Sequence, residues 1–309
     1  MLVAGLLLGR GEGRADDELR PAKAIDVFLL GGQSNMQGTG RVEKLPAELR
    51  TIPEVKFFAA GSGVPKAKGN QWMPLQSANG RQFGVEMGFG EAIKTLRGDD
   101  PVALIKFAAS GTSLERGWKP GKNAQDAGNW GAQFKGFVAT VDAGIAALEA
   151  EGWTPVIQGM CWQQGEKDAK AGLNVEESDQ SALEYAANLT AFIARVREQF
   201  AEHAGESGIR FVAGQVLPYA PMGGDVDARF PGRDLVRQAV LDLASNSGSE
   251  IALDNVGAVA TDENTCQTHA QDGDDYNPND EVHLNERGLL FLGREMAREV
   301  LGVTGSQNE

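Results

Sequence analysis

The chain has 309 residues, of which 41% are hydrophobic and 23% are charged, and its net charge is −14. This length allows one large α/β domain or two smaller ones, and the composition is ordinary for a globular protein. The acidic balance argues against a nucleic-acid partner, because phosphate binding requires a basic surface. No apolar run approaches the roughly 20 residues that a membrane-spanning helix needs, so no membrane partner is expected.

The two ends of the chain differ from its middle. The first residues, MLVAGLLLG, resemble the apolar core of a short export signal without its basic lead, although a ragged terminus is an alternative. We interpret residues 1–24 as a leader of a secreted or periplasmic protein, 25–303 as a single domain and 304–309 as a tail. Two cysteines are too few for a disulfide framework. We expect Cys161 and Cys266 to be unbridged, because Cys161 ends a predicted buried strand.

Six short apolar runs predict strands, in chain order. They are rich in β-branched residues and nearly continuous, as strands buried on both faces are. The runs are Ile25–Leu30, Val55–Phe58, Val102–Phe107, Val156–Met160, Ile209–Val216 and Ile251–Val259. Amphipathic patterns predict helices over 134–148, 189–200, 235–243 and 285–300, the last with Asn285 as its N-cap.

This alternation of strands and helices predicts a central parallel sheet with helices on both faces, which is a three-layer α/β/α sandwich. The Gly-rich stretches 59–84 and 111–133 are expected to be loops. In such sheets, ligands bind beyond the carboxyl ends of the strands. Three polar segments follow predicted strands and should converge there: GGQSNM at 31–36, AASGTSL at 108–114 and CWQQGEKDA at 161–169.

Ser34 stands alone among glycines directly after the first strand. It can cap a turn, lie in a phosphate loop or act as a nucleophile. No Gly-Lys-Ser/Thr sequence ends the segment, which excludes a Walker loop, and the chain has no Gly-x-Ser-x-Gly elbow. Gly31 and Gly32 allow a sharp turn and leave room beside the hydroxyl.

A serine nucleophile requires a base, and the chain has three histidines. His203 lies at the polar end of a predicted helix, where a cation suits the helix dipole. His269 lies in a polar stretch that is typical of an exposed loop. His283 has carboxylates close by and precedes the last helix, so we favour it as the general base. Asp280, three residues upstream, is placed to orient its ring.

Hydrogen-bond donors for an oxyanion are expected at the carboxyl edge of the predicted sheet, where Ser34 lies. Gly111 supplies a backbone N–H that pairs with the N–H of Ser34, and Gln164 adds a side-chain amide. A buried glutamine without a partner is costly, so Gln164 should face a network or a substrate. Glu166, two residues on, is placed to hold either the base or Gln164.

Metal chemistry is not expected. The acidic run DGDDYNPNDE at 272–281 does not match the ligand spacing of an EF-hand and is typical of a solvated loop. The chain has no HExxH sequence or similar set of zinc ligands. We predict neither a metal nor an organic cofactor.

With GGQSNM, AASGTSL, WQQGEKDA and DEVHLN in this order, the chain resembles the SGNH hydrolase superfamily. More narrowly, it resembles the branch that holds the sialate O-acetylesterases and carbohydrate esterase family six, which includes acetylxylan esterases. The segment FGVEMGFGE at 83–91 is similar to the Phe-Gly-Pro-Glu segment of this branch. These motifs run from residue 31 to 284, nearly the whole predicted domain.

The resemblance implies that the sandwich is of the flavodoxin-like type, and it also implies roles for individual residues. Ser34 attacks the acyl carbon, and His283 takes its proton and passes it to the departing sugar oxygen. The oxyanion hole consists of Ser34 N–H, Gly111 N–H and the Gln164 amide. The acid partner of His283 is Glu166 or Asp280, and the resemblance leaves both open.

The chain departs from the branch at three positions. Gln163 stands where the branch has histidine, Val85 where it has proline, and Ser110 where a second glycine is common. These departures bear on the substrate rather than on the reaction. Tryptophans stack on sugar faces, so Trp72, Trp118 and Trp130 are candidates for lining a cleft, with loop anchoring as the alternative. The candidate substrate-binding residues are Gln33, Gln163, Trp118 and Trp130.

The expected function is a serine esterase that removes acetyl groups from carbohydrate through an acyl-enzyme. Glycoside cleavage would instead require two carboxylates that flank the bond. The alternatives are an esterase for another acyl ester, a non-catalytic sugar-binding protein on the same fold, and a nucleotide binder that uses 31–40 as a phosphate loop. The predicted partner is an acetylated carbohydrate, and the oligomeric state is open.

Overall fold

The computed structural model describes residues 23–66, 69–171, 173, 179–218, 229–261, 266–272 and 279–303. Residues 1–22 of the predicted leader, the predicted tail and most of the acidic run at 272–281 lie outside these ranges, and export stays a prediction. None of the helices in the described ranges is both long and apolar enough to cross a membrane. Cys161 and Cys266 are buried and do not form a disulfide with each other.

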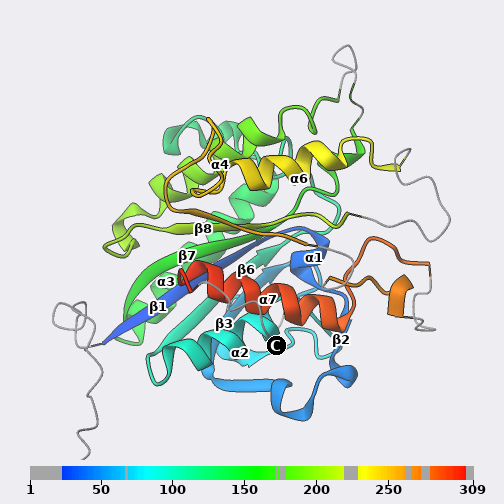
Figure 1. Ribbon diagram of the computed structural model, residues 1–309. Coiled ribbons are helices and arrows are strands. Elements are labelled where there is room, and N and C mark those ends of the chain that lie inside the picture. The colour runs from blue at the N-terminus through cyan, green and yellow to red at the C-terminus, as the bar shows by residue number, and fades with distance from the viewer. Residues whose placement is uncertain are drawn as a thin grey trace, which may run out of the picture.

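A seven-stranded sheet forms the centre of the molecule, in the order β4-β3-β6-β1-β7-β8-β9 (Figure 1). All neighbours pair in parallel except β4, which is antiparallel to β3. Five of the six predicted strands are confirmed, and only the last four residues of the sixth run, Ile251–Val259, form a strand. The strands are β1 (Ala24–Gly32), β3 (Thr51–Gly61), β4 (Met73–Gln76), β6 (Val102–Ala108), β7 (Thr154–Gln163), β8 (Arg210–Gly214) and β9 (Val256–Val259).

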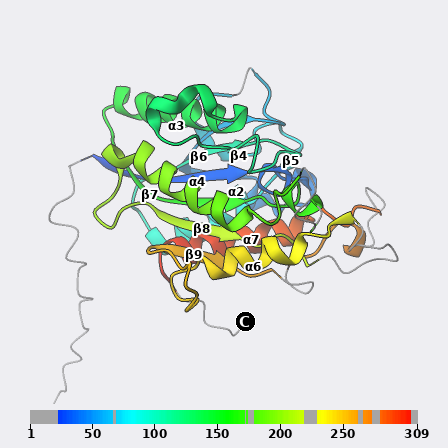
Figure 2. The ribbon, with the colours of Figure 1, turned by 90° about the horizontal axis from the view of Figure 1, so that it is seen from above.

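Helices cover both faces of this sheet, which confirms the predicted three-layer sandwich (Figures 1 and 2). One face carries α3 (Ala132–Ala150), α4 (Tyr185–Gln199) and α6 (Arg233–Asp242). The other carries α2 (Glu86–Arg97) and α7 (Glu286–Val300). As predicted, Asn285 caps α7, since its Oδ1 accepts a hydrogen bond of 3.0 Å from Gly288 N.

The chain changes direction at β1, in the middle of the sheet. After β1 it moves to β3 and returns to β6 on one side, and it then crosses to β7 on the other side. Ligand crevices in open α/β sheets form at such a switch point, beyond the carboxyl ends of the strands. The four-residue helix α1 (Ser34–Gln37) begins at this position.

The segment predicted as a loop at 59–84 contains further strands. Besides β4, it holds β5 (Gln82–Phe83), which pairs with β2 (Gly40–Arg41) in a separate two-stranded sheet. Helix α2 was not predicted at all. Its glycines lower helix propensity and interrupt the apolar pattern on which the prediction relied.

The glycines of α2 and α7 have a packing role. A Cβ atom on Gly88 would lie 2.2 Å from Leu290 O, and one on Gly293 would lie 2.1 Å from Val85 O. Both distances are far shorter than van der Waals contact. The backbones of the two helices therefore touch, and this close packing fixes the position of α7 on the sheet.

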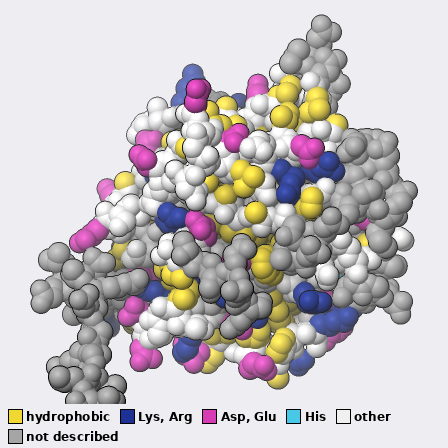
Figure 3. Space-filling model, in the orientation of Figure 1, with side chains coloured by type: hydrophobic (Ala, Val, Ile, Leu, Met, Phe, Trp, Pro, Cys, Tyr) yellow, Lys and Arg dark blue, Asp and Glu magenta, His cyan; other side chains and the backbone are white. Residues whose placement is uncertain are grey.

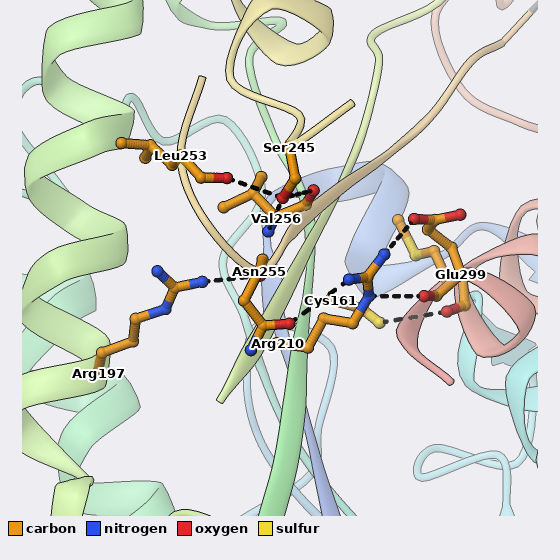
Figure 4. A network of polar contacts seen from close by, with 9 residues as sticks. Cys161, Arg197, Arg210, Ser245, Leu253, Asn255, Val256 and Glu299 are labelled. Atoms are coloured by element: carbon orange, nitrogen blue, oxygen red, sulfur yellow. Dashed lines mark hydrogen bonds and ion pairs between the residues drawn. The ribbon is translucent and has the colours of Figure 1, made fainter. Parts of the chain in front are cut away.

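Polar contacts anchor the opposite side of α7 (Figure 4). Arg210 on β8 donates to Glu299 O (2.8 Å) and Glu299 Oε1 (2.6 Å), and also to Asn255 Oδ1 (3.4 Å). Arg197 on α4 donates to Asn255 O at 2.7 Å. These contacts join α7 to β8 and the start of β9, so the segment that precedes α7 is held at the carboxyl edge of the sheet.

We predict that Gly293→Ala destabilises the protein, although alanine is the better helix former. The added Cβ overpacks the contact between α2 and α7, and such changes cost about 1–3 kcal/mol. Chemical denaturation measures the free energy of unfolding. Gly128→Ala is the control, because no atom lies within 4 Å of its added Cβ. A Gly293→Ala protein as stable as the wild type would contradict the close packing.

Candidate active site

Two glycines bring Ser34 to the carboxyl end of β1. Gly32 has a φ of +152°, and a Cβ atom there would lie 2.1 Å from Gln163 O on β7. Gln33 N donates to the same Gln163 carbonyl at 3.0 Å. The backbone thus turns tightly against β7, and Ser34 follows as the first residue of α1, with 5% of its surface exposed.

Two backbone amides at this edge are available to a ligand. The N–H groups of Ser34 and Gly111 donate to no other group within the part of the chain that the structure describes. Gly111 is exposed, with a φ of +70°, and its loop follows β6. A hydrogen bond of 3.0 Å from Ala109 N to Gly32 O ties this loop to the end of β1.

Asp280 holds the ring of His283. Its Oδ2 lies 2.8 Å from His283 Nδ1, and its Oδ1 accepts hydrogen bonds from the backbone N atoms of Val282 (3.1 Å) and His283 (3.0 Å). The side-chain hydrogen bond raises the pKa of His283 above its usual value, although burial opposes the shift. For Asp280, burial alone would raise the pKa, but the bonds from His283 lower it. With Nδ1 occupied, Nε2 is the nitrogen left for proton transfer.

The side chain of Asn35 connects the two halves of the site. Its Nδ2 donates to Val282 O (3.1 Å), and its Oδ1 accepts from Leu284 N (3.0 Å). The residue after Ser34 is therefore hydrogen bonded to both neighbours of His283. Ser34 and His283 are brought to the same edge of the sheet, but no hydrogen bond joins their side chains within the described ranges. Catalytic hydrogen bonds are often long before substrate binds.

Glu166 is not the hydrogen-bond partner of His283. Its Oε1 accepts a hydrogen bond of 2.5 Å from Asn35 Nδ2, and its side chain is buried. Burial raises the pKa of Glu166. Of the two candidates that the sequence left open, the structure places Asp280 against His283 and Glu166 behind Asn35.

Gln164 does not offer its amide to an oxyanion, which corrects the prediction. It is fully buried, and Nε2 donates to Asp168 Oδ2 (2.5 Å), Thr112 O (3.0 Å) and Gln33 Oε1 (3.1 Å). Two amide hydrogens are shared among these three acceptors, so none remains for a ligand. On the other side of this residue, the Tyr185 hydroxyl lies 2.8 Å from Gln164 O and 3.3 Å from Gln164 Oε1, and its single hydrogen serves these two acceptors.

Asp168 was quoted in the sequence motif but received no role. Its carboxylate accepts from Leu114 N (3.0 Å) and Glu115 N (3.3 Å) as well as from Gln164. Burial raises the pKa of Asp168 to about 6. Together with Gln164, Asp168 fixes the loop that carries Gly111. In the sequence, the indication that Asp168 belongs to the site was its position in the polar segment that follows a predicted buried strand.

Gln33 and Gln163 were predicted to bind substrate, and both are instead buried within the protein. Gln33 is 3% exposed, and its Oε1 accepts from Lys167 N (3.2 Å) and Gln164 Nε2 (3.1 Å). Gln163 is 1% exposed and donates to Gln215 O at 3.2 Å. Both glutamines stabilise the turns around the site rather than contact a ligand.

The tryptophans anchor loops, which corrects the prediction for Trp118. That side chain is fully buried, packs edge-on against Trp162 and donates to Thr112 Oγ1 at 2.9 Å. Trp130 packs edge-on against Phe134, lies under the guanidinium of Arg195 and donates to Asn123 O at 3.2 Å. Trp72 donates to Gly144 O at 3.1 Å. These contacts agree with the alternative in which the three tryptophans anchor loops.

His269 lies inside the protein rather than in an exposed loop. It is 1% exposed, its Nε2 lies 3.1 Å from Thr39 Oγ1, and its backbone N donates to His283 O at 3.2 Å. Burial lowers the pKa of His269. The segment around His269 thus packs beside the segment that carries His283. The polar composition of residues 262–275 had instead indicated an exposed loop.

No group of three or more His, Cys, Asp or Glu side chains within the described ranges is arranged to hold a metal ion. The site that the structure does assemble combines a hydroxyl, an Asp-paired imidazole and two unused backbone amides. Such a set is suited to acyl transfer.

The mostly parallel sheet with helices on both faces is a three-layer α/β/α fold. The family model described as "Carbohydrate esterase, sialic acid-specific acetylesterase" matches residues 24–302, so the chain belongs to this family. The protein is thus a carboxylic ester hydrolase, and its family removes acetyl groups from carbohydrate. A comparison with curated proteins gives no match.

Solved structures share the fold at low sequence identity. A protein from Arabidopsis thaliana, AT4G34215, is 19% identical with a TM-score of 0.61, and the alignment covers 90% of this chain and 98% of that one. NanS is 15% identical with a TM-score of 0.59 and coverage of 91% and 97%. The carbohydrate acetylesterase XAC1771 from Xanthomonas citri is 20% identical with a TM-score of 0.55 and coverage of 89% and 56%.

We predict that Asn35→Ala lowers the free energy of unfolding by about 2–4 kcal/mol, because it leaves buried groups without partners. It should also lower kcat, since the segment around His283 loses its attachment to α1. Thermal denaturation and ester hydrolysis measure the two effects. The exposed Asn129→Ala is the control. An Asn35→Ala protein with wild-type stability and activity would contradict the connecting role of Asn35.

Proposed function

We propose that the protein is a serine esterase that removes O-acetyl groups from carbohydrate through an acyl-enzyme, with Ser34 as the nucleophile. The supporting observation is the attachment of Asn35 to both neighbours of His283, since it brings the hydroxyl and the imidazole to one edge of the sheet. Membership of a carbohydrate esterase family supports an acetyl ester as the substrate.

In the first step, Ser34 Oγ attacks the acetyl carbon while His283 Nε2 takes the hydroxyl proton. The carbonyl oxygen becomes an oxyanion, which the N–H groups of Ser34 and Gly111 bind. The tetrahedral intermediate collapses, the bond to the sugar oxygen breaks, and Nε2 gives its proton to that oxygen. The sugar leaves with a free hydroxyl, and Ser34 carries the acetyl group.

In the second step, His283 Nε2 takes a proton from water, and the resulting hydroxide attacks the acetyl carbon. The same amides bind the second oxyanion. The bond to Ser34 Oγ breaks, and Nε2 returns the proton to Oγ. Acetate leaves, and the enzyme is regenerated without any other reactant.

Asp280 stabilises the imidazolium that forms in each step. Its Oδ2 accepts from Nδ1 at 2.8 Å, which holds the ring in the tautomer with a free Nε2. Glu166 lies nearby but hydrogen bonds to Asn35, so we assign it a positioning role. Gln164 and Asp168 likewise hold the loop of Gly111 rather than contact the substrate.

We predict that a fluorophosphonate labels the wild-type protein and that Ser34→Ala abolishes labelling. Mass spectrometry of the intact protein measures the adduct. Ester hydrolysis should fall by about 10⁴-fold or more, because no other group replaces the nucleophile. The control is Ser110→Ala, which removes an exposed hydroxyl beside Gly111. Labelling that persists in Ser34→Ala would exclude Ser34, and an unlabelled wild type would favour a sugar-binding protein.

We predict that kcat/KM falls as the pH decreases through the pKa of His283, because only the neutral imidazole accepts a proton. The bond to Asp280 places this pKa above its usual value. Asp280→Asn should therefore move the acidic limb of the pH profile to lower pH and reduce kcat by about 10²- to 10⁴-fold.

Glu166→Gln is the matched comparison, because it also replaces one carboxyl group by an amide but keeps the contact between Asp280 and His283. Its acidic limb should move less than that of Asp280→Asn, since the hydrogen bond from Asp280 is the largest cause of the shift. A larger shift in Glu166→Gln would make Glu166 the partner of His283. A flat profile from about pH 5 to 8 would argue against His283 as the base.

A further inference from the structure

A lysine lies inside the molecule, within strand β6. Lys106 is in register with Leu30 on β1 and Ala59 on β3, and every residue of β6 is buried. Figure 3 shows the ordinary arrangement on one face of the molecule, where Lys, Arg, Asp and Glu side chains lie at the surface. Lys106 is instead only 6% exposed. Burying an ammonium group is costly unless the group is paired, so this position requires an explanation.

The ion-pair partner of Lys106 is Glu86, the first residue of α2. Lys106 Nζ lies 2.5 Å from Glu86 Oε2, and Glu86 is 2% exposed. Glu86 Oε1 accepts a hydrogen bond of 2.9 Å from Gly84 N, so both carboxylate oxygens are used. A buried ion pair adds little net stability, because the loss of hydration of two ions offsets their attraction. A role in fixing local geometry therefore accounts for this pair better than a role in stability.

The ammonium group of Lys106 also holds the end of α1. Its Nζ donates to Gln37 O at 3.0 Å, and Gln37 is the last residue of the helix that begins with Ser34. A helix of four residues is too short to be stable alone, and the side chain of its N-cap residue, Gln33, makes no capping hydrogen bond. The position of α1 therefore depends on contacts from neighbouring segments.

The backbone at Gly84 packs against the same end of α1. A Cβ atom on Gly84 would lie 2.5 Å from Met36 O, and one on Gly38 would lie 2.1 Å from Gly84 Cα. Both distances are far shorter than van der Waals contact. Because Glu86 binds the N–H of Gly84, its carboxylate holds this turn as well as Lys106. The ion pair thus joins β6, the start of α2 and the end of α1.

We propose that Lys106 is a positioning residue for Ser34, held in place by its ion pair with Glu86. The inference rests on the proposed function, because it takes Ser34 as the nucleophile. Gln37 follows Ser34 by three residues, so the carbonyl that Lys106 binds is within about one helical turn, roughly 5 Å, of the nucleophile. A shift of α1 by about 1 Å would move the Ser34 hydroxyl relative to His283, and misplacement of this size can cost about 10²-fold in rate.

The test removes both charges together, in Lys106→Met with Glu86→Gln. Replacing a whole buried ion pair is often neutral for stability, whereas loss of one partner leaves a buried charge unpaired. This double variant keeps a buried pair of similar size but loses the hydrogen bond to Gln37 O. Its kcat on p-nitrophenyl acetate should fall by about 10- to 100-fold while KM stays within about twofold of the wild type. The rate of inactivation by a fluorophosphonate should fall by a similar factor.

A second double variant, Lys106→Gln with Glu86→Gln, keeps two polar groups at these positions. Its shorter side chain withdraws the donor from Gln37 O, so it serves the same test if the first variant does not fold. Circular dichroism establishes which of the two is folded. A folded variant with the kcat of the wild type would overturn the proposal, because a pair that only stabilises the fold leaves kcat unchanged.

The matched control lies at the other end of α2. Arg97, the last residue of this helix, pairs with the fully buried Asp26 near the start of β1. Arg97→Met with Asp26→Asn therefore removes another ion pair between α2 and the sheet, but at the end of the strand opposite to α1. Its kcat should stay within about twofold of the wild type. Equal losses of kcat in the control and in the Lys106 variants would overturn the proposal.

Hydrogen exchange separates this proposal from the proposed function. The backbone amides of Gln37 and Gly38 donate within α1, to Gln33 O (2.8 Å) and Ser34 O (2.7 Å). Loss of the bond from Lys106 should speed exchange of these amides by about tenfold or more, and the control should not change it. Faster exchange supports the positioning role even if the wild type hydrolyses no ester. Unchanged exchange overturns it.

Discussion

The hydrogen bonds of the Asn35 carboxamide are the interaction on which the site depends. Asn35 and Leu284 are 249 residues apart in the chain, yet Oδ1 of one accepts from the backbone of the other. The same side chain donates to Val282 O and Glu166 Oε1. A buried amide with these partners is satisfied, whereas any displacement of the 282–284 segment would leave costly unpaired groups. This coupling makes the position of His283 a consequence of where α1 begins.

The position of α1 is in turn set by close backbone contacts. A side chain on Gly32 would clash with Gln163 O, and α7 packs closely against α2 at Gly88 and Gly293. Arg210 fixes the far end of α7 through Glu299. The geometry at the carboxyl edge thus depends on contacts that lie well away from it. Side chains could not be placed so reproducibly on loops that lacked these supports.

The fold was largely predictable from the sequence because parallel strands buried on both faces leave continuous apolar runs. The catalytic roles of Ser34 and His283 stay predictions, and the structure adds that Asn35 connects their two segments and that Asp280 holds the His283 ring. Gln164 was assigned wrongly because sequence position identifies an amide at the edge but not the acceptors that already use its hydrogens. The prediction that Trp118 binds substrate was wrong for a similar reason. The sequence does not distinguish a loop residue that packs into the core from one that stays exposed. Helix α2 was not predicted, because its glycines, which allow close packing, interrupt the apolar pattern of the helix.

The proposed reaction depends on a single titratable pair, His283 and Asp280. The proposed oxyanion donors are backbone amides, which carry no titratable charge, so the pH dependence of the reaction follows from His283 and its bond to Asp280.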